Sequence, residues 1–249
     1  MKHSGGLVRK MLGAMCVSVL FFLVVYPVTG YAQERQEDIV ILLHGLGRTS
    51  RSMWPLERAL GAHGYRVVNV NYPSTRTAID HLVTHLRDEI ARCCDDPTLK
   101  LHFVTHSLGG ILARAYLKQF PLTHVGRVVM LSPPNQGSEL VDILRSAWWF
   151  RMMTGPAGQQ LGTEPISVPN SLGPVSFELG IITGSATLNP VSSIMIPGLD
   201  DGTVAVDRAR VEGMRDFLVV PYGHTFIMMR EVVIEQTVHF LRTGHFRIE

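Results

Sequence analysis

The chain contains very little cysteine, with only 3 among its 249 residues. Cys16 lies in an apolar N-terminal stretch, which leaves Cys93 and Cys94 side by side near the end of an expected helix. Adjacent cysteines rarely bond to each other, because the small ring that they close strains the peptide bond between them. We therefore expect no disulfide framework, and no group of Cys and His has the spacing of a metal site.

The chain also lacks a surplus of either charge, since its formal net charge is +2. Lys2, Arg9 and Lys10 lie ahead of residue 33, where no acidic residue occurs, so removing these three charges leaves −1 for residues 33–249. Binding to nucleic acid needs a basic surface. We therefore expect no nucleic-acid partner.

An N-terminal apolar run follows these basic residues. Residues 11–28 carry no charge, and Gly30 and Ala32 then offer small side chains for cleavage after residue 32. This pattern predicts a secretory signal peptide over residues 1–32. The run is also about long enough to cross a bilayer, so an uncleaved anchor that contacts a membrane is the alternative. Either arrangement predicts an exported protein, periplasmic or secreted.

The remainder, residues 33–249, has the composition of a folded domain. Hydrophobic residues make up 46% of the chain and charged residues 18%, which excludes a disordered protein. Apolar runs typical of buried strands alternate with helical patterns such as residues 79–91. This alternation predicts a single α/β domain with a mostly parallel sheet and helices on both faces. About six strands are expected, near residues 38–43, 65–70, 101–105, 128–131, 179–184 and 216–220.

Residues 140–178 are the least regular part of this domain. Residues 148–153 are strongly apolar, and residues 155–174 are rich in Gly, Pro, Ser and Thr. Loops that follow strand ends in parallel sheets carry the functional site, so this stretch is interpreted as a small lid that lines an acyl-chain groove. The alternative is that Trp148 and Trp149 pack into the core as part of a helix.

Ser107 lies where a strand over residues 101–105 meets a helix over residues 111–117. A sharp turn at this place is a nucleophile elbow, which lifts the serine hydroxyl out of the sheet. The turn needs small neighbours, and Gly109 meets this need, whereas Thr105 stands where a glycine is usual. The alternative is a serine that only caps the following helix.

A catalytic serine needs a histidine that accepts its proton and a carboxylate that orients the histidine. His224 follows the strand over residues 216–220, where a general base could reach Ser107. Three other histidines fit less well, because they lie in the closing helix, in the tail, or beside the serine and directed along the elbow: His239, His245 and His106.

Asp201 is the expected carboxylate. It precedes Gly202 in a turn between the last two expected strands, which gives the chain order Ser, Asp, His. The neighbouring Asp200 is the alternative, and an Asp-Gly pair is also simply a common turn.

Backbone amides are expected to complete the site as an oxyanion hole. The sequence His44-Gly45-Leu46-Gly47 follows the first expected strand, and its glycines allow close approach to a reacting carbonyl. We expect the Leu46 and Leu108 N–H groups to be the two donors. A phosphate-binding glycine loop is disfavoured, because Ser50 occupies its last glycine position.

Together these motifs resemble the α/β-hydrolase superfamily, and most closely its small lipase- and esterase-like members, over about residues 38–241. The resemblance implies a serine hydrolase that acts on small-molecule or lipid carboxylic esters, with Ser107, Asp201 and His224 as its triad and without a metal or cofactor. It also implies that residues 132–138 form a loop that shapes the site. An acyltransferase that uses the same triad, or a non-catalytic binding protein with this fold, remains the alternative.

Overall fold

The computed structural model describes residues 38–94, 96–187 and 190–247. The expected signal peptide or anchor over residues 1–32 lies outside them. No helix within the described ranges has the length and apolar character needed to cross a membrane.

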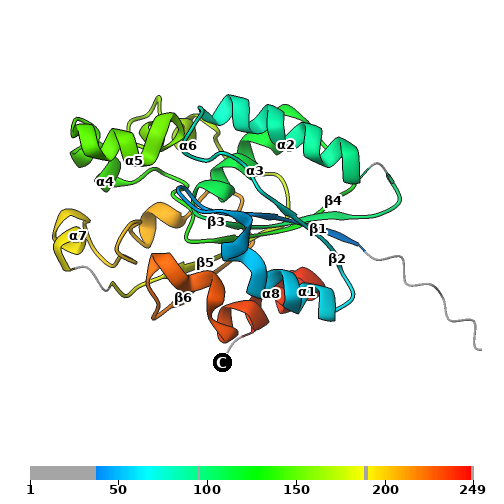
Figure 1. Cartoon of the computed structure of the whole chain (residues 1–249). Helices are drawn as coiled ribbons and strands as arrows, with labels where there is room; N and C mark the ends of the chain where they lie inside the picture. Colours follow the sequence, from blue (N-terminus) through cyan, green and yellow to red (C-terminus); the bar gives the residue numbers. More distant parts are fainter. Residues whose placement is uncertain (1–37, 95, 188–189, 248–249) are drawn as a thin grey trace, which may run out of the picture. The chain divides into compact units, whose positions relative to one another are not determined.

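A six-stranded, all-parallel sheet forms the centre of the fold (Figure 1). Its order is β2-β1-β3-β4-β5-β6. Every residue of β1, β3 and β5 is buried, as expected of apolar runs covered on both faces. The α/β fold with about six parallel strands is therefore confirmed. The strands are β1 (Ile39–Leu43), β2 (Arg66–Val70), β3 (Leu101–His106), β4 (Val125–Leu131), β5 (Leu179–Gly184) and β6 (Asp216–Val220).

Helices cover both faces of the sheet, because alternate strand residues point to opposite sides. Ile41 of β1 packs with the helices α2 (Ile79–Cys93) and α3 (Leu108–Gln119), whereas Val40 and Leu42 pack with α1 (Trp54–Ala62) and α8 (Glu231–Thr243). Figure 1 shows these two pairs on opposite sides of the strands. The prediction of helices on both faces is confirmed.

The irregular stretch contains three short helices, α4 (Glu139–Leu144), α5 (Trp148–Gln159) and α6 (Val168–Ser171). Trp148 is 70% exposed and Trp149 42%, so the alternative that both pack into the core is wrong, although both are helical. The helix α5 is kinked at Gly155, where φ is 61°. A side chain there would overlap the Thr75 carbonyl, so only glycine allows this contact.

A buried arginine of α3 holds the chain at both ends of this stretch. The Arg114 guanidinium of α3 donates hydrogen bonds to the carbonyl oxygens of Asn135 at 3.0 Å and of Gly173 at 2.6 Å. No carboxylate among the described residues pairs with it, and burial lowers the pKa of Arg114 to about 10. These hydrogen bonds fix the chain on both sides of residues 139–172.

The remaining short helices are α7 (Pro190–Met195) and the 3-10 turns η1 (Ser50–Met53), η2 (Asp207–Ala209) and η3 (His224–Met229). The expectation for the adjacent cysteines is wrong, because a disulfide joins Cys93 to Cys94. The helix α2 ends at Cys93, and Cys94 leaves the helical backbone with φ −139° and ψ 47°. This change of direction lets the two side chains meet.

Candidate active site

Ser107 lies between β3 and α3 with a backbone φ of 52°, a region that residues other than glycine rarely adopt. It occupies the N-cap position of α3, but its side chain makes no hydrogen bond to that helix. Its Oγ lies instead 3.0 Å from His224 Nε2. The geometry is therefore that of the elbow, and not that of the capping alternative.

The two glycines after Ser107 lie in close contacts. A Cβ at Gly109 would lie 2.5 Å from the Leu43 carbonyl oxygen, so α3 begins directly against the end of β1. A Cβ at Gly110 would meet side chains instead, at 3.0 Å from Pro133 Cβ and 3.2 Å from Met130 Sδ. Thr105, which stands where a glycine is usual, is fully buried.

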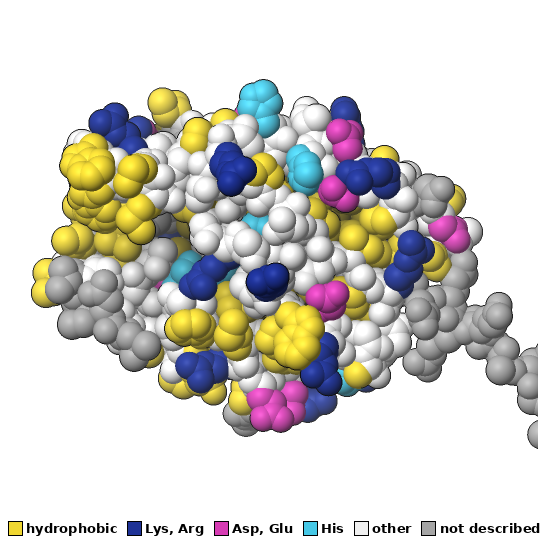
Figure 2. Space-filling model, viewed as in Figure 1, with side chains coloured by type: hydrophobic (Ala, Val, Ile, Leu, Met, Phe, Trp, Pro, Cys, Tyr) yellow, Lys and Arg dark blue, Asp and Glu magenta, His cyan; other side chains and the backbone are white. Residues whose placement is uncertain are grey.

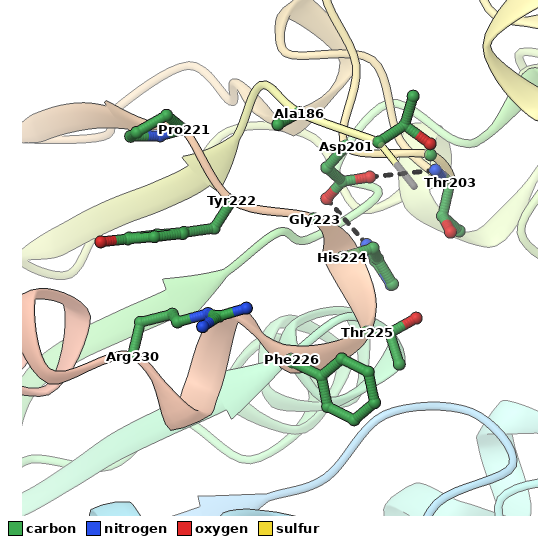
Figure 3. A pocket seen from close by; sticks show the side chains of 12 residues that line it. Ala186, Asp201, Thr203, Pro221, Tyr222, Gly223, His224, Thr225, Phe226 and Arg230 are labelled. Carbon is green, nitrogen blue, oxygen red and sulfur yellow. Dashed lines mark hydrogen bonds and ion pairs between the residues drawn. The ribbon is translucent and has the colours of Figure 1, made fainter. Parts of the chain in front are cut away.

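His224 is held between the serine and an acid. Its Nδ1 lies 2.8 Å from Asp201 Oδ2 (Figure 3). Because a carboxylate can only accept, Nδ1–H is the donor, and Nε2 is left to accept the Ser107 hydroxyl proton. The structure thus brings together all three residues that the sequence predicts as a triad.

Asp201, and not Asp200, faces the histidine. Its second oxygen, Oδ1, accepts the backbone N–H groups of Thr203 at 3.0 Å and Val204 at 2.8 Å. The Asp200 carboxylate accepts the Ser193 hydroxyl and the Gly202 N–H, so it stabilises the turn instead.

The environment keeps Asp201 ionised. Burial raises the pKa of the Asp201 carboxyl, but the His224 ring and the hydrogen bonds from His224, Ser132 and Val204 outweigh this effect. The net pKa lies below its ordinary value, so the carboxylate is charged at neutral pH and can stabilise a protonated His224.

His106 has a role that the sequence did not reveal. It was expected to point along the elbow, but its Nε2–H donates to the His224 carbonyl oxygen at 2.9 Å. The ring is buried. Burial lowers the pKa of His106 well below its usual value, and the neighbouring His224 lowers it further. Strand alternation carried the relevant signal, because Val104 and His106 share the face on which η3 packs. His106 therefore positions the chain at His224.

The loop after β1 rests directly on Ser107. A Cβ at Gly45 would lie 3.2 Å from Ser107 Cβ and 2.6 Å from His106 Nδ1, so only glycine allows this approach. Before it, the His44 ring stacks on Tyr72 with centroids 4.0 Å apart, and the Tyr72 hydroxyl donates to the His44 carbonyl.

The two expected oxyanion donors, Leu46 and Leu108, directly follow Gly45 and Ser107, the two residues that lie in contact. Within the described residues, neither the Leu46 nor the Leu108 N–H donates to a protein acceptor. Both amides therefore remain available for a bound group.

Two cavities flank the triad. One, of about 250 Å³, lies between Ser107 and the irregular stretch, and the side chains of Leu140, Val141, Phe150 and Leu161 line it. The other, of about 320 Å³, lies behind Asp201 and His224 and is lined by Tyr222, Phe226 and Arg230 (Figure 3). The residues expected to roof an acyl-chain groove thus line a cavity at the serine. Met152 and Met153, in the apolar run over residues 148–153, are instead 71% and 65% exposed.

Three solved structures share this architecture. The mature lipase BlEst2 from Bacillus licheniformis is 18% identical, with 82% of this chain and 92% of that chain covered and a TM-score of 0.66. Phospholipase PlaB from Legionella pneumophila is 16% identical, with 84% and 59% covered and a TM-score of 0.68. The type II thioesterase YbtT of the yersiniabactin pathway is 14% identical, with 84% and 95% covered and a TM-score of 0.56. At these identities the likeness concerns the fold.

The sequence itself identifies the family. No curated protein matches the chain. A family model described as "Alpha/beta hydrolase family" matches residues 40–246, which include the sheet except for Ile39 and all the residues of the site. The chain therefore belongs to the α/β-hydrolase family.

Proposed function

We propose that this protein is a serine hydrolase that cleaves carboxylic esters through an acyl-enzyme. The observation that carries the proposal is the continuous hydrogen-bonded line from Ser107 Oγ through His224 to Asp201, with distances of 3.0 Å and 2.8 Å. This arrangement supplies a nucleophile, a base and an orienting acid in the geometry that acyl transfer requires.

In the proposed reaction, the Ser107 oxygen attacks the ester carbonyl while His224 Nε2 takes the hydroxyl proton. The Leu46 and Leu108 N–H groups stabilise the tetrahedral oxyanion, and each such donor contributes about 3 kcal/mol to lowering the barrier. His224 then returns the proton to the leaving alcohol. Water attacks the acyl-enzyme in the same way, with His224 again as the base.

The apolar cavity beside Ser107 supports an acyl group as the part of the substrate that remains on the serine. Its lining of Leu, Val and Phe side chains favours a hydrocarbon chain, because transfer of apolar surface from water is favourable. Small-molecule and lipid esters both offer such a chain. The lipase, phospholipase and thioesterase among the related folds also act on acyl groups, according to their names, which supports this substrate class.

The test is hydrolysis of a chromogenic short-chain ester by purified wild type and Ser107→Ala. We expect turnover to fall by at least about 10³-fold, because the residual rate comes from binding and the oxyanion hole alone. His239→Ala, in α8, is the control and should retain full activity, because His239 lines neither cavity at the triad. Unchanged turnover in a folded Ser107→Ala variant would refute the proposal.

Two further measurements address the alternatives. A fluorophosphonate probe should label wild type but not Ser107→Ala, whereas a non-catalytic binding protein would not be labelled. Product analysis in the presence of competing alcohols distinguishes hydrolysis from acyl transfer, since the same triad performs both reactions.

A further inference from the structure

A third cavity, which is polar, adjoins the oxyanion loop. It has a volume of about 350 Å³ and lies between the chain after β1, residues 47–49, and the chain after β2, residues 71–76. Both strands end at the same edge of the sheet as β3, which carries Ser107. Two arginines, Arg48 and Arg76, line this cavity, and none of its described lining residues is acidic.

Neither arginine is neutralised. Among the described residues, no carboxylate forms an ion pair with Arg48 or Arg76, whereas arginines such as Arg127 and Arg208 are paired. The Arg48 side chain is half-buried, and its neighbours are the Thr225 carbonyl at 3.4 Å and the Phe226 ring at 5.9 Å. Two uncompensated guanidinium groups make the cavity positive, which favours an anion.

A neutral donor lies in the same cavity. The Ser74 side chain is 3% exposed, and its oxygen accepts the Gly47 N–H at 3.0 Å. Because the Ser74 oxygen accepts there, its hydroxyl proton can serve as a donor to a group in the cavity.

Arg48 connects this cavity to the serine. It lines the polar cavity and also the apolar cavity at Ser107, and it follows the expected oxyanion donor Leu46 by two residues. Its charge also lowers the pKa of the neighbouring His106. In Figure 2, basic side chains lie beside the hollow in which histidine is visible. A substrate carbonyl at Ser107 would thus have Arg48 beside it.

The geometry points to a subsite for a phosphate group on the leaving alcohol or thiol of the substrate. This inference rests on the proposed function. The acyl chain takes the apolar cavity, because its Leu, Val and Phe side chains would desolvate an anion. The charged group of the substrate is therefore on its leaving alcohol or thiol. There Arg48, Arg76 and the Ser74 hydroxyl supply charge-assisted hydrogen bonds. A phospholipid headgroup and a phosphorylated carrier thiol share this chemistry.

The test compares two matched substrate pairs with one short acyl group. One pair is the acyl ester of glycerol 3-phosphate and that of glycerol, and the other is the acyl thioester of phosphopantetheine and that of pantetheine. For at least one pair, we expect kcat/KM to be about tenfold or more higher with phosphate, since a charged hydrogen bond is worth roughly that factor. The pair with the larger preference identifies the headgroup or the thiol as the source.

Arg48→Gln and Arg76→Gln should each lower this preference through KM, and Arg48→Lys should retain part of it. Arg58→Gln, on the exposed face of α1, is the matched control and should leave both rates and the preference unchanged. As an independent readout, calorimetry of Ser107→Ala with the preferred free product, glycerol 3-phosphate or phosphopantetheine, should show binding that Arg76→Gln weakens.

The possible failures are distinct. Equal kcat/KM within both pairs, or arginine variants that lower both members of a pair equally, would overturn the phosphate subsite but not the ester hydrolase. Loss of Ser107-dependent turnover with every ester would instead overturn the proposed function.

Discussion

The elbow and the stretch that covers it differ sharply in packing. In the elbow, all residues of β3 and 9 of the 12 residues of α3 are buried. In residues 139–172, by contrast, Trp148 and Ile166 are 70% and 88% exposed, and Figure 2 shows hydrophobic side chains gathered over α4 and α5. The elbow is therefore tightly packed and residues 139–172, the cover, are lightly packed, so substitutions in the two regions should have different effects on stability.

The largest effect is expected from crowding the elbow. Gly109→Ala places a Cβ 2.5 Å from the Leu43 carbonyl oxygen, which belongs to the backbone of a central strand and cannot yield. We expect the free energy of unfolding to fall by about 3 kcal/mol, as measured by urea denaturation. The control is Gly61→Ala in α1, where an added Cβ would meet no atom of a neighbouring segment within 4 Å. Alanine should raise the free energy of unfolding there by roughly 0.5–1 kcal/mol. Equal responses of the two variants would show that the elbow is not tightly packed.

An effect of comparable size is expected from acidification, and it arises on the elbow side and not in residues 139–172. His44, His102 and His106 are buried on or next to β1 and β3, and burial lowers the pKa of each imidazole below 6.5. The unfolded chain then binds more protons below pH 6.5, so the free energy of unfolding should decrease as pH falls from 6.5 toward these lowered pKa values. Each group contributes a slope of up to about 1.4 kcal/mol per pH unit.

Urea denaturation between pH 8 and pH 5 measures this slope. His102→Gln, remote from the triad, should make the slope shallower, because it removes one of the three titrating groups. Residues 139–172 contain no histidine and contribute no such term. Stability that stays constant down to pH 5 would contradict the prediction.

The smallest effect is expected in the cover. Trp148 lies largely in solvent, so Trp148→Ser should change the free energy of unfolding by less than about 0.5 kcal/mol. Turnover of a soluble short-chain ester should also be retained, because Phe150, and not Trp148, lines the cavity at Ser107. Thermal unfolding measures the stability, and initial rates measure the turnover. A large loss of stability would mean that Trp148 is packed against other residues.

Most of the fold could be predicted from the sequence, because buried parallel strands leave continuous apolar runs such as residues 39–43 and 179–184. The places of Ser107, Asp201 and His224 followed from strand ends in a sheet of this kind. The choice between Asp200 and Asp201 did not, because it depends on which carboxylate the turn at Gly202 directs toward the histidine.

Other features depend on contacts between distant segments, which no local pattern records. Strand alternation places His106 on the face where η3 packs, but its hydrogen-bond partner, the His224 carbonyl, lies 118 positions away. The exposure of Trp148 also depends on such contacts, because a helix rich in aromatic residues has the same sequence pattern in a core as on a surface. The Cys93–Cys94 bond depends on where the backbone leaves α2.

Arg114 has a consequence for how this protein could diversify. Its bonds to the Asn135 and Gly173 carbonyls clamp the chain just outside both borders of the cover. A different segment placed between Asn135 and Gly173 would keep the same two attachment points near Ser107. Under the proposed function, exchange of residues 139–172 would alter the substrate preference while Ser107, Asp201 and His224 stay in place.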